Sequence, residues 1–436
     1  MRWPAPDELR VRRLGEPRFA SPLSGPEHFV DDSDRVLLCS SESELASFVE
    51  RDEPPPSFEP AGPRAELYFE PPSTTCALVT CGGLCPGLHD VVRAIVFALH
   101  HGYRVGRVLG FRFGFQGLTR EPHRPPIELD PGLVEHLHHY GGSLLGTSRG
   151  PQPVPEMVDV LADRGVDTLF AIGGDGTMRG AAALVSEIEA RGLDIAVVGV
   201  PKTIDNDLPW VERSFGFATA VEEARAALTG AYAEARSVWN GVGLVKLMGR
   251  HAGFIAAHAT LASGQANFCL VPEVPFRLDG ESGLMAQLVA RLEERRHALV
   301  VVAEGAGQDL LPPLPEEERR DASGNVRLAD IGAHLRRQIE EHCEAQGIDI
   351  ELKYIDPSYL IRSRPANTFD AGFAQILGQH AVHAAMAGRT ELMIGLWNDR
   401  FTHVPLALAT AGRDSLDPKG EIWQRVLATT RQPRLE

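Results

Sequence analysis

A glycine-rich motif, GGDGT at residues 173–177, has the residue types and the setting of a phosphate-binding loop. It follows an apolar run at 167–172 and precedes a segment, 178–191, that we expect to be helical. In the order strand, glycine turn and helix, backbone N–H groups and the helix N-terminus converge on a phosphate. Asp175 would suit a Mg²⁺ ion held between its carboxylate and the phosphates. The alternative interpretation is a tight turn with a solvated aspartate.

Two further glycine-rich loops favour phosphate binding. Residues 81–87 (CGGLCPG) follow an expected strand at 76–80 and precede an expected helix at 88–101. Residues 141–150 form the other loop, which includes the fixed positive charge of Arg149. The loop at 81–87 matches neither GxGxxG nor GK[ST], so the Rossmann fingerprint and the Walker A motif do not apply.

An acidic loop, PKTIDND at residues 201–207, follows the apolar strand expected at 195–200. Its carboxylates, Asp205 and Asp207, would repel each other unless a cation or a reacting proton lay between them. One interpretation makes one of them a general base that takes a proton from an alcohol, while the other stays solvated or near Mg²⁺. The alternative is an acidic turn on the surface.

Strands and helices alternate regularly from Thr75 onward. This alternation predicts an α/β fold of two lobes, each a mainly parallel sheet covered by helices on both faces. Ligands of such sheets bind at the carboxyl ends of the strands, where the four loops above begin. In the second half, expected strands at 242–247 and 297–303 run into Met248-Gly249-Arg250 and into Glu304. Residues 1–72, rich in Pro, Glu and Ser, read as an extended arm with a few short elements.

Composition limits the possible partners and the compartment. The chain has 436 residues and a net charge of −16, which argues against non-specific binding to nucleic acid or to acidic membranes. No apolar run reaches the length of a membrane span, and the start lacks the apolar core of a signal peptide. Six cysteines lie scattered without a CxxC pair, so we expect neither disulfides nor a zinc site, and a cytoplasmic protein.

Several motifs in one order together resemble the 6-phosphofructokinase family. They are the glycines of the loop at 81–87, GGDG at 173–176, PKTIDND at 201–207 and Met248-Gly249-Arg250. The runs LMGR at 247–250 and KYIDPSY at 353–359 look most like the plant and trypanosomatid branch of ATP-using enzymes. The similarity extends from about Thr75 to the C-terminus, and several motifs in register are far more specific than one glycine loop.

The resemblance implies phosphoryl transfer from Mg²⁺·ATP to the 1-hydroxyl of fructose 6-phosphate, in an allosteric glycolytic kinase. The implied nucleotide-binding residues are Gly83, Arg149, Gly150, Gly174, Asp175, Gly176 and Thr177, with Asp175 also binding Mg²⁺. The implied catalytic residues are the general base Asp205, together with Arg250 and Thr203. The implied sugar-phosphate site contains Thr203, Ile204, Asp205, Met248, Gly249, Arg250, Glu304, Lys353, Tyr359 and Arg362.

The family pattern also implies a division into lobes and an assembly. We expect a nucleotide-binding lobe at 73–216 plus 363–415 and a sugar-phosphate-binding lobe at 217–362 plus 416–436, after the arm at 1–72. The implied assembly is a homo-oligomer, a dimer or tetramer, in which Lys353 reaches a neighbouring subunit's site.

The sequence departs from the family pattern at a few positions. His89 stands where the family usually has Asn, close to the nucleotide, which leaves the donor contacts there open. His251-Ala252-Gly253 replaces a more usual Tyr-Ser/Cys-Gly. Gly241 replaces an arginine of the short bacterial enzymes, and plant-type relatives lack that arginine too.

Two residues disagree about the phosphoryl donor. Pyrophosphate-dependent relatives have Asp where this chain has Gly176, and glycine removes bulk and negative charge from the place of the nucleotide α-phosphate. Lys202 is shared with pyrophosphate users. Weighing Gly176 more heavily predicts ATP, with a pyrophosphate-dependent enzyme as the alternative.

Other functions are disfavoured by the motif set. NAD kinases and diacylglycerol kinases share GGDG but lack the TIDND loop followed by Met-Gly-Arg. A non-catalytic sugar-phosphate sensor would have lost Asp175, Asp205 or Arg250, and all of these are present.

Overall fold

The computed structural model describes the chain except for residues 1–2, 24–28, 313–314, 316–326 and 436. The described chain divides into two compact units. Unit 1 comprises residues 1–204, 208–216 and 363–413, and unit 2 comprises 205–207, 217–362 and 414–436. The last three residues of the loop at 201–207, which include Asp205, therefore belong by their contacts to unit 2.

The core of unit 1 is a nine-stranded sheet in the order β3-β4-β17-β16-β10-β9-β6-β7-β8. Its strands are β3 (Val36–Leu37), β4 (Ser57–Pro60), β17 (Arg400–Pro405), β16 (Leu392–Trp397), β10 (Ala196–Pro201), β9 (Thr168–Gly173), β6 (Thr75–Thr80), β7 (Arg107–Phe111) and β8 (Ile127–Glu128). The strands from β16 to β7 are parallel to one another, and those at either edge are antiparallel.

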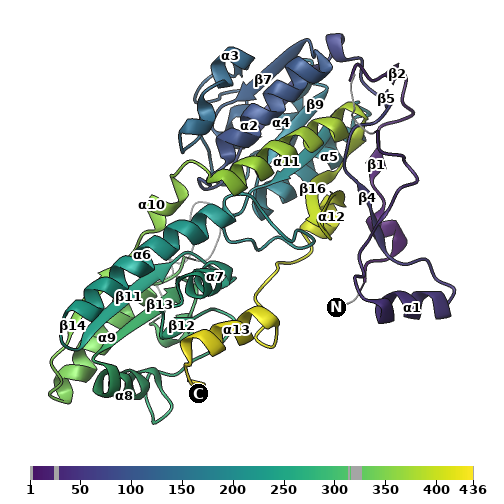
Figure 1. Cartoon of the computed structure of the whole chain (residues 1–436). Helices are drawn as coiled ribbons and strands as arrows, with labels where there is room; N and C mark the ends of the chain where they lie inside the picture. The colour runs from purple at the N-terminus through teal and green to yellow at the C-terminus, as the bar shows by residue number, and fades with distance from the viewer. Residues whose placement is uncertain (1–2, 24–28, 313–314, 316–326, 436) are drawn as a thin grey trace. The chain divides into compact units, whose positions relative to one another are not determined.

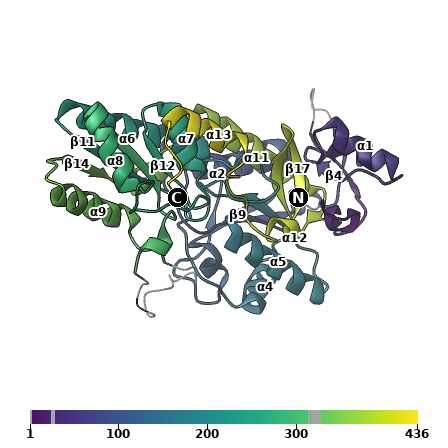
Figure 2. The ribbon, with the colours of Figure 1, turned by 90° about the horizontal axis from the view of Figure 1, so that it is seen from below.

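Helices cover both faces of this sheet. Alternate residues of each central strand point to opposite faces, so Leu78 packs with α2 (Leu88–Phe97) and α11 (Thr368–Met386). Val79 packs on the other face with α4 (Val154–Asp163) and α5 (Asp175–Ala190). Figure 2 shows these two helix pairs on opposite sides of β9. Strands buried on both faces explain the continuous apolar runs of the sequence.

Unit 2 is built on a four-stranded parallel sheet in the order β12-β13-β11-β14. Its strands are β12 (Phe268–Leu270), β13 (His297–Ala303), β11 (Gly241–Leu247) and β14 (Glu351–Ile355). One face packs on α8 (Leu284–Arg295) and α9 (Ile331–Ala345), and the other on α6 (Phe217–Ser237) and α7 (Phe254–Ser263), as Figure 1 shows. Helix α13 (Glu421–Thr430) packs on α7, and the short α10 (Ser358–Arg362) follows β14. The predicted α/β class with parallel sheets covered on both faces is confirmed.

The N-terminal segment, residues 1–72, is joined to the rest of unit 1 through strand pairing. Strand β1 (Arg12–Arg13) pairs with β15 (Arg389–Thr390), β2 (Phe19–Ala20) pairs with β5 (Glu66–Leu67), and β3 and β4 extend the large sheet. Helix α1 (Glu42–Glu50) lies between β3 and β4, and begins at a Ser41 cap.

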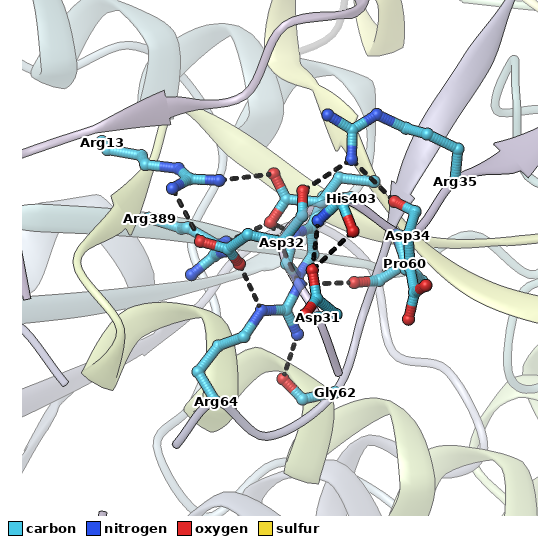
Figure 3. A network of polar contacts seen from close by, with 12 residues as sticks. Arg13, Asp31, Asp32, Asp34, Arg35, Pro60, Gly62, Arg64, Arg389 and His403 are labelled. Atoms are coloured by element: carbon cyan, nitrogen blue, oxygen red, sulfur yellow. Dashed lines mark hydrogen bonds and ion pairs between the residues drawn. The ribbon is translucent and has the colours of Figure 1, made fainter. Parts of the chain in front are cut away.

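A buried ion network joins this segment to the sheet (Figure 3). Arg64 pairs with Glu59 at 3.1 Å and with Asp32 at 2.9 Å, and Arg389 contacts the same two carboxylates. Burial alone would raise the pKa of Glu59, but His403 and Arg389 hold that pKa far below its ordinary value. Glu59 is therefore ionised and tied to Arg389, a residue that follows helix α11.

Among the described residues, no helix has the length and apolar character needed to cross a membrane.

Candidate active site

In unit 1, two glycine-rich loops leave the carboxyl ends of β6 and β9, next to the end of β10. The loop at 141–150, which was also expected to leave a strand, follows the 3-10 helix η5 (Leu137–His139) instead and packs beside them. The Cys81 amide donates to the Ile172 carbonyl at 2.9 Å, which joins the first loop to the end of β9. The Gly82 amide donates to the Ser148 carbonyl at 3.1 Å, which brings in the loop at 141–150 and with it Arg149 and Gly150. The polar loops expected to bind phosphate thus lie side by side, as the parallel sheet requires.

The GGDGT motif forms the turn between β9 and α5. Gly174 is the N-cap in an extended conformation, and α5 begins at Asp175. A Cβ on Gly173 would lie 2.1 Å from the buried Thr177 hydroxyl, so Gly173 allows the Thr177 side chain to fold over the turn. A Cβ on Gly176 would meet nothing within 4 Å. The first turn of α5 therefore presents backbone N–H groups beside open space, the arrangement that binds anions.

Asp175 is held by arginines. Its Oδ2 contacts Arg179 one turn along α5 and lies 3.3 Å from Nη2 of Arg413. Its Oδ1 is buried, and no described residue provides it with a hydrogen bond. The described residues contain no group of three or more His, Cys, Asp or Glu that could form a protein-only metal site. A single carboxylate with a spare oxygen fits Mg²⁺, which is commonly bound by one or two carboxylates plus substrate phosphates.

Lys202 links β10 to the first glycine loop. Its buried Nζ donates to the Gly83 carbonyl at 2.6 Å, and its amide donates to the Gly173 carbonyl at 2.9 Å. Thr203 follows, and its carbonyl accepts from the Ser214 hydroxyl at 2.6 Å. The lysine cation is thereby placed against the same loops that present Gly83 and Gly174.

In unit 2, two strand-end loops pack against each other. The Glu304 amide donates to the Leu247 carbonyl at 2.9 Å, and the Gly305 amide donates to the Gly249 carbonyl at 3.1 Å. Gly249 has φ of 129°, and a Cβ there would lie 2.6 Å from a carbonyl oxygen, so glycine is required. This packing brings Met248, Gly249 and Arg250 together with Glu304.

Asp205 lies in the same part of unit 2. Burial raises its pKa to about 7, and the neighbouring carboxylates Asp207 and Glu304 act in the same direction. The backbone N–H and the guanidinium of Arg250 oppose this rise. Burial also raises the pKa of Glu304, against the opposing charge of Arg250. A carboxylate with a pKa near 7 can accept a proton at neutral pH, which is the property that a general base needs.

Helix α10 is held in unit 2 through Asp356, which lies just before it. Within this helix, the Arg362 guanidinium lies 4.5 Å from the centre of the Tyr359 ring. Asp356 accepts hydrogen bonds from the Ser358 amide at 3.2 Å and hydroxyl at 2.5 Å, at the start of the helix. Lys246, near the end of β11, pairs with Asp356 at 2.9 Å. Sequence reasoning missed Lys246, although a lone charge at the end of an apolar strand was a usable signal.

Lys353 is not brought together with the other unit 2 residues. It pairs in register with Gly243 and lies in the middle of β14, with its Nζ 2.6 Å from Glu351 Oε1. Gly243 lies four positions before Leu247, where β11 ends. At the usual rise of a strand this is a distance of about 13 Å.

The predicted residues divide between the two units. In unit 1 these are Gly83, Arg149, Gly150, Gly174, Asp175, Gly176, Thr177, Lys202, Thr203 and Ile204. In unit 2 they are Asp205, Met248, Gly249, Arg250, Glu304, Tyr359 and Arg362, together with Lys353, which lies apart from the others. Sequence reasoning did not find Arg179 and Arg413 on Asp175, because the Arg413 contact joins residues far apart in the chain.

Both units have their polar loops at the carboxyl ends of parallel strands, as ligand-binding α/β proteins do. Residues 75–385 match the family model described as Phosphofructokinase, and the chain belongs to the phosphofructokinase family.

Relatives and a solved structure agree with this assignment. The chain is 51% identical to an ATP-dependent 6-phosphofructokinase of Amycolatopsis methanolica, covering 98% of this chain and 95% of the relative. It is 45% identical to an ATP-dependent 6-phosphofructokinase of Trypanosoma brucei brucei, covering 97% and 87%. A crystal structure of a pyrophosphate-dependent phosphofructokinase from Marinobacter aquaeolei matches with a TM-score of 0.67 at 20% identity, covering 83% and 92%. The last likeness concerns the fold alone, and the expected resemblance to the trypanosomatid branch is confirmed.

Proposed function

We propose that this protein transfers the γ-phosphoryl group of Mg²⁺·ATP to the 1-hydroxyl of fructose 6-phosphate. The products are fructose 1,6-bisphosphate and ADP. Family membership and relatives named ATP-dependent 6-phosphofructokinase support this reaction. The observation that carries the mechanism is the Asp205 carboxyl, with its pKa raised to about 7 beside Arg250.

Asp205 is the general base in this proposal. It takes the proton of the 1-hydroxyl as that oxygen forms its bond to the γ-phosphorus, and the bond to the bridging oxygen of ADP breaks. Arg250 offsets the negative charge that develops, and Thr203 helps to orient the sugar next to the base. Positioning and charge stabilisation supply most of the rate in such transfers.

The unit 1 residues bind the nucleotide. The backbone N–H groups around Gly83, Gly174 and Thr177 and the positive charge of Arg149 would bind the phosphates, with Gly150 and Gly176 leaving space. Mg²⁺ would be held by Asp175 and, when bound, would neutralise phosphate charge. The spare buried oxygen of Asp175 supports this role.

The unit 2 residues bind the sugar phosphate. Met248, Gly249 and Glu304 would contact the sugar with Ile204, and Arg362 and Tyr359 would contact the 6-phosphate. Lys353 would serve the site of another subunit, which its distance from the unit 2 strand ends favours. Mixing inactive Asp205→Asn protein with inactive Lys353→Ala protein would then restore activity in hybrid oligomers. No restoration after demonstrated subunit exchange would contradict this role and the dimer or tetramer it requires.

ATP is favoured over pyrophosphate as the donor. Gly176 places neither a side chain nor a negative charge where the α-phosphate of the nucleotide would lie, and a Cβ there would meet no protein atom within 4 Å. The six cysteines are all buried and free, which supports a cytoplasmic protein.

A coupled assay of the purified protein tests the proposed function. With saturating fructose 6-phosphate, kcat/KM should be far higher for Mg²⁺·ATP than for pyrophosphate. A higher kcat/KM for pyrophosphate would overturn the donor assignment, and turnover with neither donor would overturn the reaction.

A further inference from the structure

His89 lies near the start of α2, and each of its ring nitrogens makes a hydrogen bond to the backbone of the same loop. Its Nδ1 lies 2.8 Å from the Tyr140 carbonyl oxygen, and the Leu144 amide lies 2.8 Å from its Nε2. A backbone N–H can only donate, so Nε2 accepts from Leu144 and has no proton. Nδ1 then has the proton and donates to Tyr140. Both contacts exist together only in this neutral tautomer, and the ring is buried.

The loop held by His89 is the one that presents Arg149. Its second half is tied separately, because the Thr80 hydroxyl donates to the Gly146 carbonyl at 2.6 Å and Gly82 bonds Ser148. The first half is where His89 acts, at Tyr140 and Leu144. Gly141 lies between Tyr140 and Leu144, and a Cβ on it would lie 1.8 Å from the Ser363 carbonyl oxygen. The backbone is therefore closely packed at this point.

We propose that neutral His89 is a positioning residue, which holds the loop at 140–150 in the shape that binds nucleotide phosphates. A proton on Nε2 would place two N–H groups against each other and break the bond to Leu144. Replacing His89 with a side chain that cannot make both contacts should therefore lower nucleotide affinity. The proposal rests on the proposed function, because it takes this loop to be part of the nucleotide site.

Other titratable and charged groups surround α2. Asp90 and Arg93 lie on the helix itself, and Asp90 interacts electrostatically with His89 and His138. The short 3-10 helix η5 (Leu137–His139) also provides His139, and Glu135 precedes it. Helix α11, packed along α2, provides Asp370, His380 and His383. All of these remain when only residue 89 is changed, so comparing variants isolates the effect of His89.

Asparagine is the matched replacement. Its amide NH₂ can donate to Tyr140 and its amide oxygen can accept from Leu144, but it does not titrate. Leucine has neither function. Titration calorimetry of the full chain with Mg²⁺·ATP at pH 8 compares wild type, His89→Asn and His89→Leu. We expect His89→Asn to stay within about threefold of wild type. His89→Leu should bind about tenfold more weakly, since it loses both hydrogen bonds to the loop.

Hydrogen exchange of the nucleotide-free protein separates positioning from packing. The Leu144 amide should exchange faster in His89→Leu than in His89→Asn. The control His100→Asn, on a histidine that contacts the Leu129 carbonyl, should change neither quantity.

Two results would overturn the proposal. One is a His89→Leu protein that binds Mg²⁺·ATP as tightly as wild type. The other is unchanged Leu144 exchange in His89→Leu. If that variant does not fold, His89→Asn decides alone, and an affinity more than tenfold below wild type would overturn the proposal. Arg149→Ala separates this inference from the proposed function. If Arg149→Ala leaves affinity unchanged, the loop is not part of the nucleotide site; if only Arg149→Ala weakens binding, the role of His89 is wrong.

Discussion

The ammonium group of Lys246 lies 2.9 Å from a carboxylate oxygen of Asp356, one residue beyond the paired ends of β11 and β14. The same ammonium lies 3.0 Å from Asp330, the N-cap of α9. Asp356 in turn caps the start of α10 through Ser358. One lysine thus joins the strand that runs into Met248 to the helix that presents Tyr359 and Arg362.

Replacing this lysine should affect sugar-phosphate binding selectively. In Lys246→Met, Asp356 and Asp330 lose their shared counter-ion, so α10 should shift relative to β11. We expect KM for fructose 6-phosphate to rise about tenfold, equivalent to about 1.4 kcal/mol, with KM for ATP nearly unchanged. Lys246→Arg should recover part of the loss, and the exposed Lys419→Met is the control. Equal rises in both KM values would contradict a specific role for Lys246.

The buried ion network should stabilise unit 1. Arg389→Met removes a partner of both Glu59 and Asp32, and it leaves the buried charge of Glu59 with fewer counter-ions. Removing one partner of a buried ion pair costs about 3–5 kcal/mol, and denaturant unfolding measures the loss. The control is Arg35→Met, because Arg35 is exposed and its guanidinium donates to the backbone carbonyls of Asp32 and Asp34. A loss no larger than the control's would show that the network adds little.

Acid should destabilise the protein through its buried histidines. Burial lowers the pKa of His380 and of His403 to about 4, although Glu59 opposes the shift at His403. In the unfolded chain these groups take up protons near pH 6.5. Between pH 6.5 and 4 the unfolded state therefore binds more protons, so stability falls as pH falls, by about 1.4 kcal/mol per pH unit for each histidine. His380→Leu should flatten this slope, whereas the exposed His136→Leu should not. Identical slopes would refute the assignment.

The donor assignment predicts a charge effect at one glycine. Gly176→Asp would place a carboxylate near the α-phosphate of ATP, where two unit charges about 4 Å apart repel by roughly 4 kcal/mol at an effective dielectric of 20. Gly176→Asn adds nearly the same volume without charge, and a Cβ at this position would meet no protein atom within 4 Å. We expect KM for ATP to rise much more in the aspartate variant than in the asparagine variant. Equal effects would mean that volume, not charge, excludes the nucleotide.

Much of the fold could be predicted from apolar runs. The strand expected at 297–303 is observed as His297–Ala303, and the one at 76–80 as Thr75–Thr80, because parallel strands are buried on both faces. Strand β17 was not predicted, since Thr402 and His403 make its sequence polar. Its burial depends on Glu59 and Arg389, which are distant in sequence.

The positions of the site residues could be predicted from sequence motifs, but the pKa of Asp205 could not. The glycine loops at 81–87 and 173–177 and the Asp205 loop follow strands, so their positions could be predicted from the sequence, whereas the loop at 141–150 follows the 3-10 helix η5. The raised pKa of Asp205 depends mainly on burial, with Asp207 and Glu304 acting in the same direction and Arg250 against it. Burial, Glu304 and Arg250 reach Asp205 only in the folded chain. His89 contacts the backbone atoms of Tyr140 and Leu144. Because any residue type has these backbone atoms, the sequence could not predict the contacts.

The rate of Asp205→Asn is the most direct test of the central claim. The amide keeps the shape of the carboxylate but cannot accept the proton, so kcat should fall by roughly 10²–10⁴ while nucleotide affinity stays nearly unchanged. Since the Asp205 pKa is about 7, wild-type kcat/KM should rise with pH through that value, and the variant should lack this rise. A variant that keeps more than about a third of wild-type kcat, with the same pH profile, would contradict the assignment of Asp205 as the base.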